Sequence, residues 1–301
     1  MDLSKDTELQ QLRKYQYNYN YSRFPYLKSF KKNPYTYLKA IFYMELSAIL
    51  VYFLLKTKIK PNTVTLTYGL LGLTGGILLA IPTNETIFIA TIIFFSKGIL
   101  DWSDGHYARK TSQTSITGDI LDHYGAFLGA LGFQIGLGFY VAQKSDILLF
   151  YFLIPLIPLF YAGKLHSYSL SMLFKNHFDI KIIKKYIHPT SQNISKEFID
   201  IKSKQDLGKK YSLFYNVARN LLDDRARTVD FICLLLILEM FTPIFFTWII
   251  FLGFVVKGFL LFSASLYIVT RKDWTENEFK QKIAEISKAF DSIKKYNNKI
   301  G

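Results

Sequence analysis

Long apolar runs constrain this chain more than any other feature. Half of its 301 residues are hydrophobic, and several runs approach the roughly 20 apolar residues that cross the hydrocarbon core of a bilayer. Pro243 can divide the last long run into a hairpin because proline interrupts a helix. We therefore predict an all-α integral membrane protein built as a bundle of six transmembrane helices. The expected spans are Val64–Ile81, Thr86–Leu100, Gly118–Val141, Asp146–Leu173, Val229–Thr242 and Ile244–Val269.

The first 60 residues precede these spans and differ from them in composition. Residues 1–33 are polar, basic and rich in Tyr, unlike a cleavable signal peptide. The apolar core of Pro34–Lys60 is short and holds Glu45 and Ser47, so we predict an N-terminal interfacial amphipathic helix, with a seventh span as the alternative. The expected organisation is a cytoplasmic segment over residues 1–60, a six-helix membrane domain over residues 61–270 with a cytoplasmic loop at 171–227, and a cytoplasmic tail helix over residues 271–301.

The distribution of basic residues indicates the orientation of the chain. The formal net charge is +14, and Lys and Arg gather before Val64, in Trp102–Thr117, in Ser171–Arg227 and after Thr270. The positive-inside rule therefore puts both termini and the Asp101–Asp122 region on the cytoplasmic side of the inner or cell membrane. Such scattered basic loops suit anionic lipid headgroups, and we expect no nucleic acid partner because they form no single basic module.

Glycine recurs at three- and four-residue steps in two of the expected spans. Small residues at this spacing let helix backbones approach closely in lipid. The sequence therefore predicts close packing of the first and third spans on other helices. The glycines are Gly69, Gly72, Gly75 and Gly76 in the first span, and Gly125, Gly129, Gly132 and Gly136 in the third.

The stretch "DWSDGHYARKTSQTSITGDILDHYGAF" (Asp101–Phe127) places carboxylates beside membrane-spanning sequence, where charges are costly and tend to mark function. Asp101 and Asp104 share one helix face, and Asp122 and Ala126 share a face of the next helix. Carboxylates that converge without His or Cys ligands suit Mg²⁺, Mn²⁺ or Ca²⁺ better than zinc. The pattern therefore indicates a hard-cation site.

Small residues and an arginine accompany these carboxylates. Gly105 and Ala108 keep one side of the helix small, and Arg109 offers a forked donor that suits phosphate oxygens. A carboxylate site for two metal ions, with an arginine and a small-residue surface, has the groups that pyrophosphate cleavage requires.

These residues together resemble the signature of the CDP-alcohol phosphotransferases. Members of this membrane family move a phosphate-linked alcohol from a cytidine diphosphate donor to a hydroxyl acceptor and release CMP. "KPNTVT" (Lys60–Thr65) also resembles the family's Pro-Asn-x-x-Thr motif, and the resemblance covers about Leu46 to Val269, including the six-helix membrane core. The matching run is Asp101-x-x-Asp104-Gly105-x-x-Ala108-Arg109, eight residues, Gly118, three residues, Asp122.

The resemblance implies a role for each matching position. Asp101, Asp104 and Asp122 would bind two Mg²⁺ or Mn²⁺ ions at the donor's pyrophosphate. Gly105 and Ala108 would make room for the cytidine end, and Arg109 would bind phosphate. The resemblance also suggests a homodimer. The remaining positions expected near the donor are Asn62, Thr65, Ser115 and Gly118.

The chain departs from the family signature at Ala126. The signature ends Asp-x-x-x-Asp, and its last aspartate is both a metal ligand and the proposed general base, neither of which alanine can be. Two explanations are open: an active enzyme deliberately inactivated so that it holds substrate, or a naturally degenerate member. We favour the first because every other signature position is intact. Asp119 lies on the wrong side of Asp122 to replace the missing carboxylate.

Several basic residues are candidates for the acceptor site. Lys164 and His166 could line an acceptor pocket or reach the headgroups, and Arg225 and Arg227 could bind an acceptor phosphate or anchor a helix. Lys257 lies within an apolar run, which makes it a functional candidate. Lys97, one turn before Asp101, could pair with that carboxylate or touch donor phosphate.

We therefore expect a CMP-releasing transferase of phospholipid or related phospho-conjugate biosynthesis, with a CDP-linked donor, an alcohol acceptor and membrane lipid as partners. The donor could be CDP-diacylglycerol with a polar acceptor, or a CDP-linked headgroup passed to a lipid or glycan. The alternative is a non-catalytic membrane scaffold that binds metal and CDP. A cation transporter is disfavoured because the acidic residues lie near one membrane face.

Overall fold

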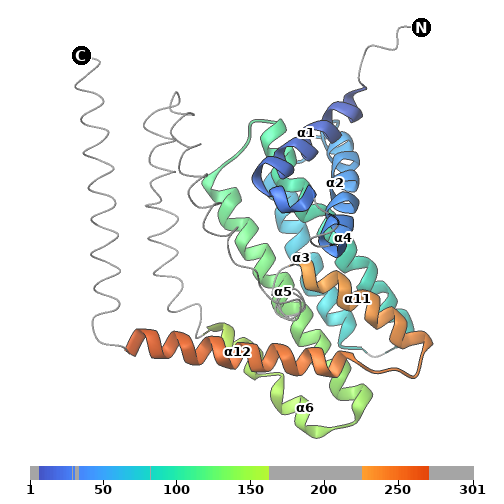
Figure 1. Cartoon of the computed structure of the whole chain (residues 1–301), viewed down its shortest axis with the longest axis vertical. Helices are drawn as coiled ribbons and strands as arrows, with labels where there is room; N and C mark the ends of the chain where they lie inside the picture. The colour runs from blue at the N-terminus through green and yellow to red at the C-terminus, as the bar shows by residue number, and fades with distance from the viewer. Residues whose placement is uncertain (1–6, 29, 31–33, 82, 163–225, 271–301) are drawn as a thin grey trace. The chain divides into compact units, whose positions relative to one another are not determined.

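All the secondary structure that the computed structural model describes is helical. The described residues are 7–28, 30, 34–81, 83–162 and 226–270. The helices are α1 (Glu8–Arg23), the 3₁₀ helix η1 (Pro25–Lys28), α2 (Pro34–Leu54), α3 (Pro61–Leu79), α4 (Asn84–Lys110), α5 (Ile116–Ser145), α6 (Leu148–Leu153), α11 (Ala226–Phe241) and α12 (Thr247–Thr270) (Figure 1). The predicted all-α class is confirmed for this part of the chain.

Five of these helices are long and apolar enough to cross a bilayer: α2, α3, α4, α5 and the Thr247–Ala264 part of α12. These helices fit an integral membrane protein, as the apolar runs predicted. The predicted span from Asp146 begins with α6 and a helical stretch over residues 156–162, and its remainder lies outside the described residues. Because α11 has only 16 residues, the total of six spans stays a prediction.

α2 forms from the segment for which the sequence predicted an interfacial helix. α2 meets the length and hydropathy that a membrane span needs, so the alternative of a further span remains open beside the interfacial placement. One face of α2 is buried, and residues on it, including Ala40, Met44, Ala48 and Val51, pack against α1 and α4. The N-terminal helices therefore pack together with the start of the membrane core.

The signature region is more helical than the expected Trp102–Thr117 loop. α4 continues to Lys110 and α5 starts at Ile116, so only residues 111–115 connect them. Arg109 and Lys110 lie in the last turn of α4, where positive charge interacts favourably with the helix dipole. Ser115 caps α5 by accepting a hydrogen bond from the Gly118 amide at 3.0 Å, as serine commonly does at this position. The loop boundaries predicted from charge were therefore wrong.

The glycines of α3 and α5 meet where the two helices cross. A Cβ built on Gly69 would lie 3.1 Å from Cα of Gly125, and one on Gly72 would lie 2.5 Å from Cα of Gly129. A Cβ on Gly76 would collide with the backbone of Gly132. The predicted close approach of helix backbones is confirmed, and its partners are the first and third expected spans themselves.

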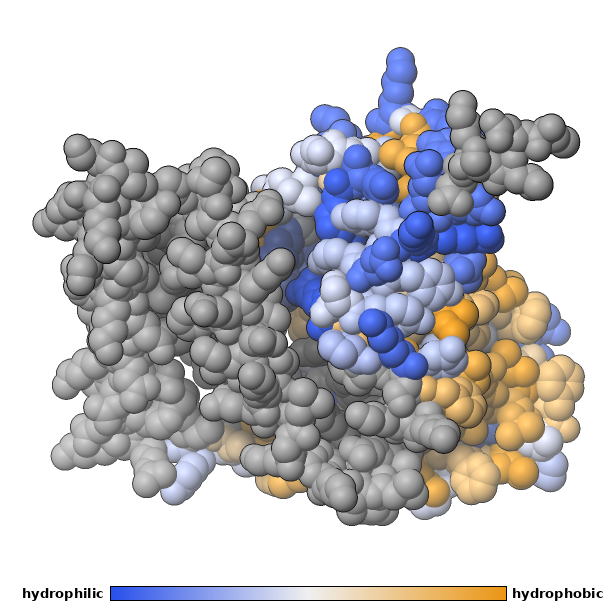
Figure 2. Space-filling view, turned by 45° about the horizontal axis from the view of Figure 1, so that its top comes forward, coloured by the Kyte–Doolittle hydropathy of each residue, from blue (hydrophilic) through white to orange (hydrophobic). Residues whose placement is uncertain are grey.

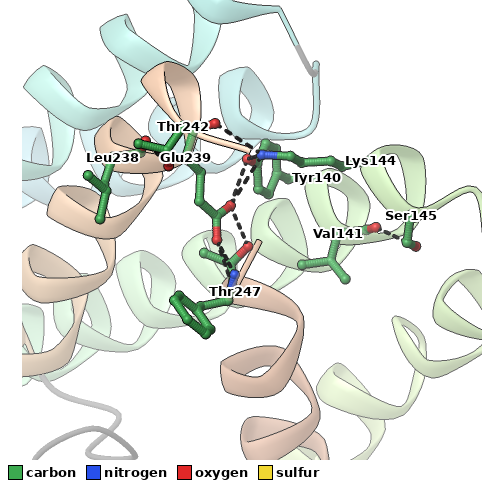
Figure 3. A network of polar contacts seen from close by, with 9 residues as sticks. Tyr140, Val141, Lys144, Ser145, Leu238, Glu239, Thr242 and Thr247 are labelled. Carbon is green, nitrogen blue, oxygen red and sulfur yellow. Dashed lines mark hydrogen bonds and ion pairs between the residues drawn. The ribbon is translucent and has the colours of Figure 1, made fainter. Parts of the chain in front are cut away.

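Glu239 ties the α11–α12 turn to α5 through a buried polar network (Figure 3). Its Oε1 accepts hydrogen bonds from the backbone amides of Phe246 at 2.6 Å and Thr247 at 2.8 Å. Its Oε2 accepts from the hydroxyls of Tyr140 and Thr247, each at 2.9 Å, and lies 3.5 Å from Nζ of Lys144. The carboxylate thus satisfies donors at the start of α12, next to the break predicted at Pro243.

The described residues divide into two compact units. The first contains α1 to α6, residues 154–157, α11 and the beginning of α12 up to Phe254. The second contains residues 158–162 and 255–270, and within it Phe160 lies 6.0 Å from Phe259 and 5.8 Å from Phe262, centroid to centroid. The domain boundaries drawn from the sequence stay a prediction.

Hydrophilic and hydrophobic surfaces separate on the visible face of the molecule. In Figure 2, hydrophilic residues gather at the end that carries the N-terminal helices, and hydrophobic residues lie beside and below them. Large apolar side chains on α3 and α4, including Leu66, Leu70, Phe88 and Ile92, are exposed, as the lipid-facing surface of a membrane protein requires.

The glycine crossing gives a prediction about stability. Gly76→Ala adds a single Cβ that must displace the backbone of α5, so it should destabilise the fold by about 1–3 kcal/mol. Denaturant unfolding of the protein in detergent measures the change. Thr74→Ala is the control, because Thr74 lies on the same helix and is exposed. Equal stability of the two variants would contradict a tight α3–α5 crossing.

Candidate active site

Asp104 is held at the contact of α3 with α4. Its side chain is 7% exposed, and Oδ2 accepts a hydrogen bond from the Thr65 hydroxyl at 2.7 Å. The Gly105 amide donates to Oδ1. Because Thr65 closes the Pro-Asn-x-x-Thr motif and Asp104 belongs to the aspartate signature, this hydrogen bond brings the two motifs into contact.

Asp122 is held by a residue that the sequence analysis missed. The Tyr68 hydroxyl donates to Asp122 Oδ1 at 2.6 Å and lies at the same distance from the Asp122 carbonyl oxygen. The Tyr68 ring is fully buried and packs on Gly125, where a Cβ would lie 2.6 Å from Cε2. Tyr68 follows Thr65 by three residues, so helical spacing alone could have pointed to it.

The three signature aspartates are electrostatic neighbours. Asp101 and Asp104 each interact with Asp122, and all three carboxylates interact with the Tyr68 hydroxyl. Within residues 7–162 and 226–270, apart from the undescribed positions, no three His, Cys, Asp or Glu side chains are gathered as a formed metal site. Two of the aspartates are instead engaged by Thr65 and Tyr68.

The chemistry of this set of side chains fits a hard cation. Its groups are carboxylates and hydroxyls from α3, α4 and α5, which are oxygen ligands of the kind that Mg²⁺ and Mn²⁺ prefer. Asp101, Asp104 and Asp122 are the residues that would hold such ions. The metal site therefore remains a prediction that the residues present support.

The Lys97 side chain lies beside the glycines at which α3 and α5 cross. Its side chain is 7% exposed, its Cε lies 3.3 Å from the position of a Cβ on Gly72, and its Nζ lies 5.0 Å from the Tyr68 ring centroid. It interacts electrostatically with Asp101, but the two form none of the ion pairs within 4.0 Å found among the described residues. Lys97 thus compensates carboxylate charge at longer range than a direct ion pair does.

Three of the positions expected near the donor lie together at the beginnings of α3 and α5. A Cβ on Gly118 would lie 3.1 Å from Oδ1 of Asn62 and 3.3 Å from Oγ of Ser115. Gly118 thus leaves a small gap between a polar amide and a hydroxyl. This arrangement groups Asn62, Ser115 and Gly118 as the resemblance implied, and their contact with a donor stays a prediction.

Arg109 lies across the small surface of α4. A Cβ on Gly105 would lie 3.0 Å from Nη1 of Arg109, so the guanidinium occupies the space that the glycine leaves open. Ala108 is partly exposed nearby in sequence. The guanidinium also stacks on Tyr19 of α1, with 3.8 Å from Cζ to the ring centroid. The sequence analysis assigned no role to α1, and the composition of this helix did not predict its contact with Arg109.

Ala126 lies on α5, one turn after Asp122, and is exposed. Its methyl group can neither bind a metal ion nor accept a proton. The exposed position indicates that a longer side chain at residue 126 would fit without displacing the core.

The described structure does not test the acceptor candidates. Lys164, His166 and Arg225 lie outside the described residues. Arg227 belongs to the first turn of α11, of which only the backbone is described there, and Lys257 is partly buried in α12, in the second unit. Their roles stay predictions.

Comparison with known proteins agrees with the signature. Residues 58–168 match the family model described as CDP-alcohol phosphatidyltransferase, a range that includes α3, α4 and α5. A CDP-diacylglycerol–glycerol-3-phosphate 3-phosphatidyltransferase from Haemophilus influenzae is 48% identical over 42 residues, which are 14% of this chain and 23% of that protein. The alignment thus spans less than a quarter of this relative. Residues 58–168 thus resemble a CDP-alcohol phosphatidyltransferase domain, and the family resemblance predicted from the signature is confirmed over this range.

The Thr65–Asp104 contact gives a prediction that needs no ligand. Thr65→Val keeps the shape of the side chain but removes the donor to a buried carboxylate, which should cost about 1.5–3 kcal/mol of folding stability. Denaturant unfolding in detergent without divalent cations measures it. Thr67→Val is the matched control, since Thr67 is exposed on the same helix and donates only to the Thr63 carbonyl. A loss no larger than that of the control would show that this hydrogen bond is dispensable.

Proposed function

We propose that this protein is a membrane-bound CDP-alcohol phosphotransferase, whose site is built to transfer a phospho-alcohol group from a CDP-linked donor to a hydroxyl acceptor with release of CMP. The observation that carries the proposal is the union of two motifs: Thr65 donates to Asp104 at 2.7 Å, and both residues lie in the matched domain. The domain and the apolar helices support a place in phospholipid biosynthesis.

The transfer breaks one P–O bond and forms another. The acceptor oxygen attacks the donor phosphorus next to the transferred alcohol, and the bridging oxygen leaves with CMP. Mg²⁺ or Mn²⁺ bound by Asp101, Asp104 and Asp122 would neutralise the pyrophosphate. Arg109 supplies a planar donor for phosphate oxygens, and Thr65 and Tyr68 orient two of the carboxylates. The proton of the acceptor hydroxyl must pass to a base.

That base is missing at residue 126 in this chain. An aspartate one turn after Asp122 would share its helix face, whereas Ala126 has no group that takes a proton. We propose that the present form binds donor and metal ions but transfers slowly for this reason. The two explanations, deliberate inactivation and natural degeneracy, make the same prediction for the chemistry.

The distribution of basic residues supports a membrane side for this site. Basic residues beside the signature support an active site at the cytoplasmic face of the inner or cell membrane, where a lipid substrate and a water-soluble nucleotide can meet. The family resemblance supports a homodimer.

A second candidate function is a non-catalytic membrane scaffold that binds metal and CDP. The observation that favours it is Ala126, since a chain that had lost catalysis could keep the remaining signature for binding. The two candidates differ in what a restored carboxylate does.

Ala126→Asp should restore turnover. General bases contribute roughly 10²–10⁴-fold, so CMP release should rise by about that factor. The assay uses purified protein in lipid vesicles, with Mn²⁺ or Mg²⁺ and a panel of CDP-linked donors and alcohol acceptors. Ala126→Asn is the matched control, because the amide has nearly the same shape but is no base. Asp104→Asn added to Ala126→Asp should abolish the restored activity.

The other outcomes of this assay favour the second candidate or overturn part or all of the proposal. Metal-dependent CDP binding without CMP release in both forms would favour the scaffold. Rapid CMP release by the Ala126 form would overturn the assignment of residue 126 as the base position. Absence of CDP binding in every form would overturn the proposed function as a whole.

A further inference from the structure

The N-terminal helix is docked firmly on the helices that precede and carry the signature. Arg13 of α1 forms an ion pair with Glu45 of α2 at 2.7 Å. Gln16 donates from Nε2 to the Ser47 hydroxyl at 2.8 Å and lies 3.2 Å from the Trp102 carbonyl oxygen of α4. Gln16 is also almost fully buried. α1 is therefore held by specific polar contacts and packs alongside α2 and near the C-terminal part of α4 (Figure 1).

Two tyrosines of α1 form an aromatic surface beside the end of α4. Tyr15 and Tyr19 are one turn apart, with ring centroids separated by 6.4 Å and planes inclined by 12°. Tyr15 stacks on His106 at 5.4 Å, and Nζ of Lys110 lies 4.5 Å from its centroid. Tyr19 receives Arg109 at 3.8 Å. These contacts place the cationic end of the signature helix on tyrosine rings.

In the described part of the chain, the guanidinium of Arg109 contacts an aromatic ring and is not paired with a carboxylate. Among the described residues it forms no ion pair within 4.0 Å, and its Nε is buried without a hydrogen-bond partner. The Tyr19 ring lies over the guanidinium, with 3.8 Å from Cζ to the ring centroid, and Nη1 lies 3.0 Å from the position of a Cβ on Gly105. An arginine stacked on an aromatic ring keeps its in-plane N–H donors available, whereas one paired with a carboxylate has used them.

We propose that Tyr19 is a positioning residue for the donor site: its ring holds the Arg109 guanidinium against Gly105, so that the N–H donors stay free for the phosphates of a CDP-linked donor. This inference rests on the proposed function. Tyr19 lies outside the matched residues 58–168, so the N-terminal segment completes a site that the family domain alone does not.

A purely structural role of Tyr19 predicts different behaviour. In that case loss of the ring would lower stability but leave the affinity for CDP unchanged in the folded protein. The hydroxyl offers a second alternative, because it accepts a hydrogen bond from Nη1 of Arg23 at 2.9 Å. The experiment therefore needs one variant without the ring and one without the hydroxyl.

The test is the affinity of the full-length protein for CDP in the presence of Mn²⁺, measured by calorimetry in detergent. Tyr19→Leu should weaken binding about 3- to 30-fold, the range expected for a cation–π contact of this kind, and Tyr19→Phe should stay within about twofold of the starting protein. Tyr52→Leu is the matched control, because Tyr52 holds Lys56 at 3.8 Å on α2 in a similar contact, and its affinity should not change.

A double-variant comparison separates positioning from stability. In an Arg109→Ala background, Tyr19→Leu should weaken CDP binding no further, because its effect passes through Arg109. If Tyr19→Leu fails to fold, Tyr19→Gln replaces it, since glutamine suits a partly exposed helix position.

Three results would overturn the inference. The first is unchanged affinity in folded Tyr19→Leu, and the second is equal weakening by Tyr19→Phe and Tyr19→Leu. The third is a further loss in the Arg109→Ala background. Metal-dependent CDP binding that disappears in Asp104→Asn, together with any of these results, would leave the proposed function standing. Absence of CDP binding by the starting protein would reject both.

Discussion

The close crossing of α3 and α5 is the constraint on which the rest of the structure depends. Glycines on both helices remove the side chains that would keep the backbones apart, with Gly69 against Gly125 and Gly72 against Gly129. The same crossing brings Tyr68 within hydrogen-bond distance of Asp122. It also leaves room for the Lys97 side chain beside Gly72 and Gly129. Small residues thus do two things here: they pack helices in lipid, and they set the position of a charged site.

Three kinds of contact stabilise the charged side chains of this site in a membrane protein. Hydroxyls of Thr65 and Tyr68 hold two carboxylates, Lys97 offsets carboxylate charge from within the helix crossing, and Arg109 lies on an aromatic ring without an ion-pair partner among the described residues. Isolated charges in such surroundings would be costly. The arrangement gathers carboxylates and an arginine, the groups on which the metal-assisted phosphate transfer that we propose would depend.

The polar residues of α2 have a structural role that the sequence did not reveal. Glu45 and Ser47 favoured an interfacial helix because polar residues are costly inside a bilayer. In the structure they are docking points for α1, through Arg13 and Gln16. The tyrosines of α1 had no periodic apolar pattern or motif that named a partner. Their contacts with His106, Arg109 and Lys110 join residues some 90 positions apart, and local spacing carries no information about such pairs.

The sequence by itself determined the helical class, the apolar spans, the glycine spacing and the signature residues, because each is a local pattern with a period or a fixed spacing. It also exposed the missing carboxylate at Ala126. Tertiary structure alone decided which helices those glycines join, that Thr65 and Tyr68 hold Asp104 and Asp122, and that Tyr19 lies over Arg109. These are contacts between segments distant in the chain, and their geometry depends on how closely whole helix backbones can approach.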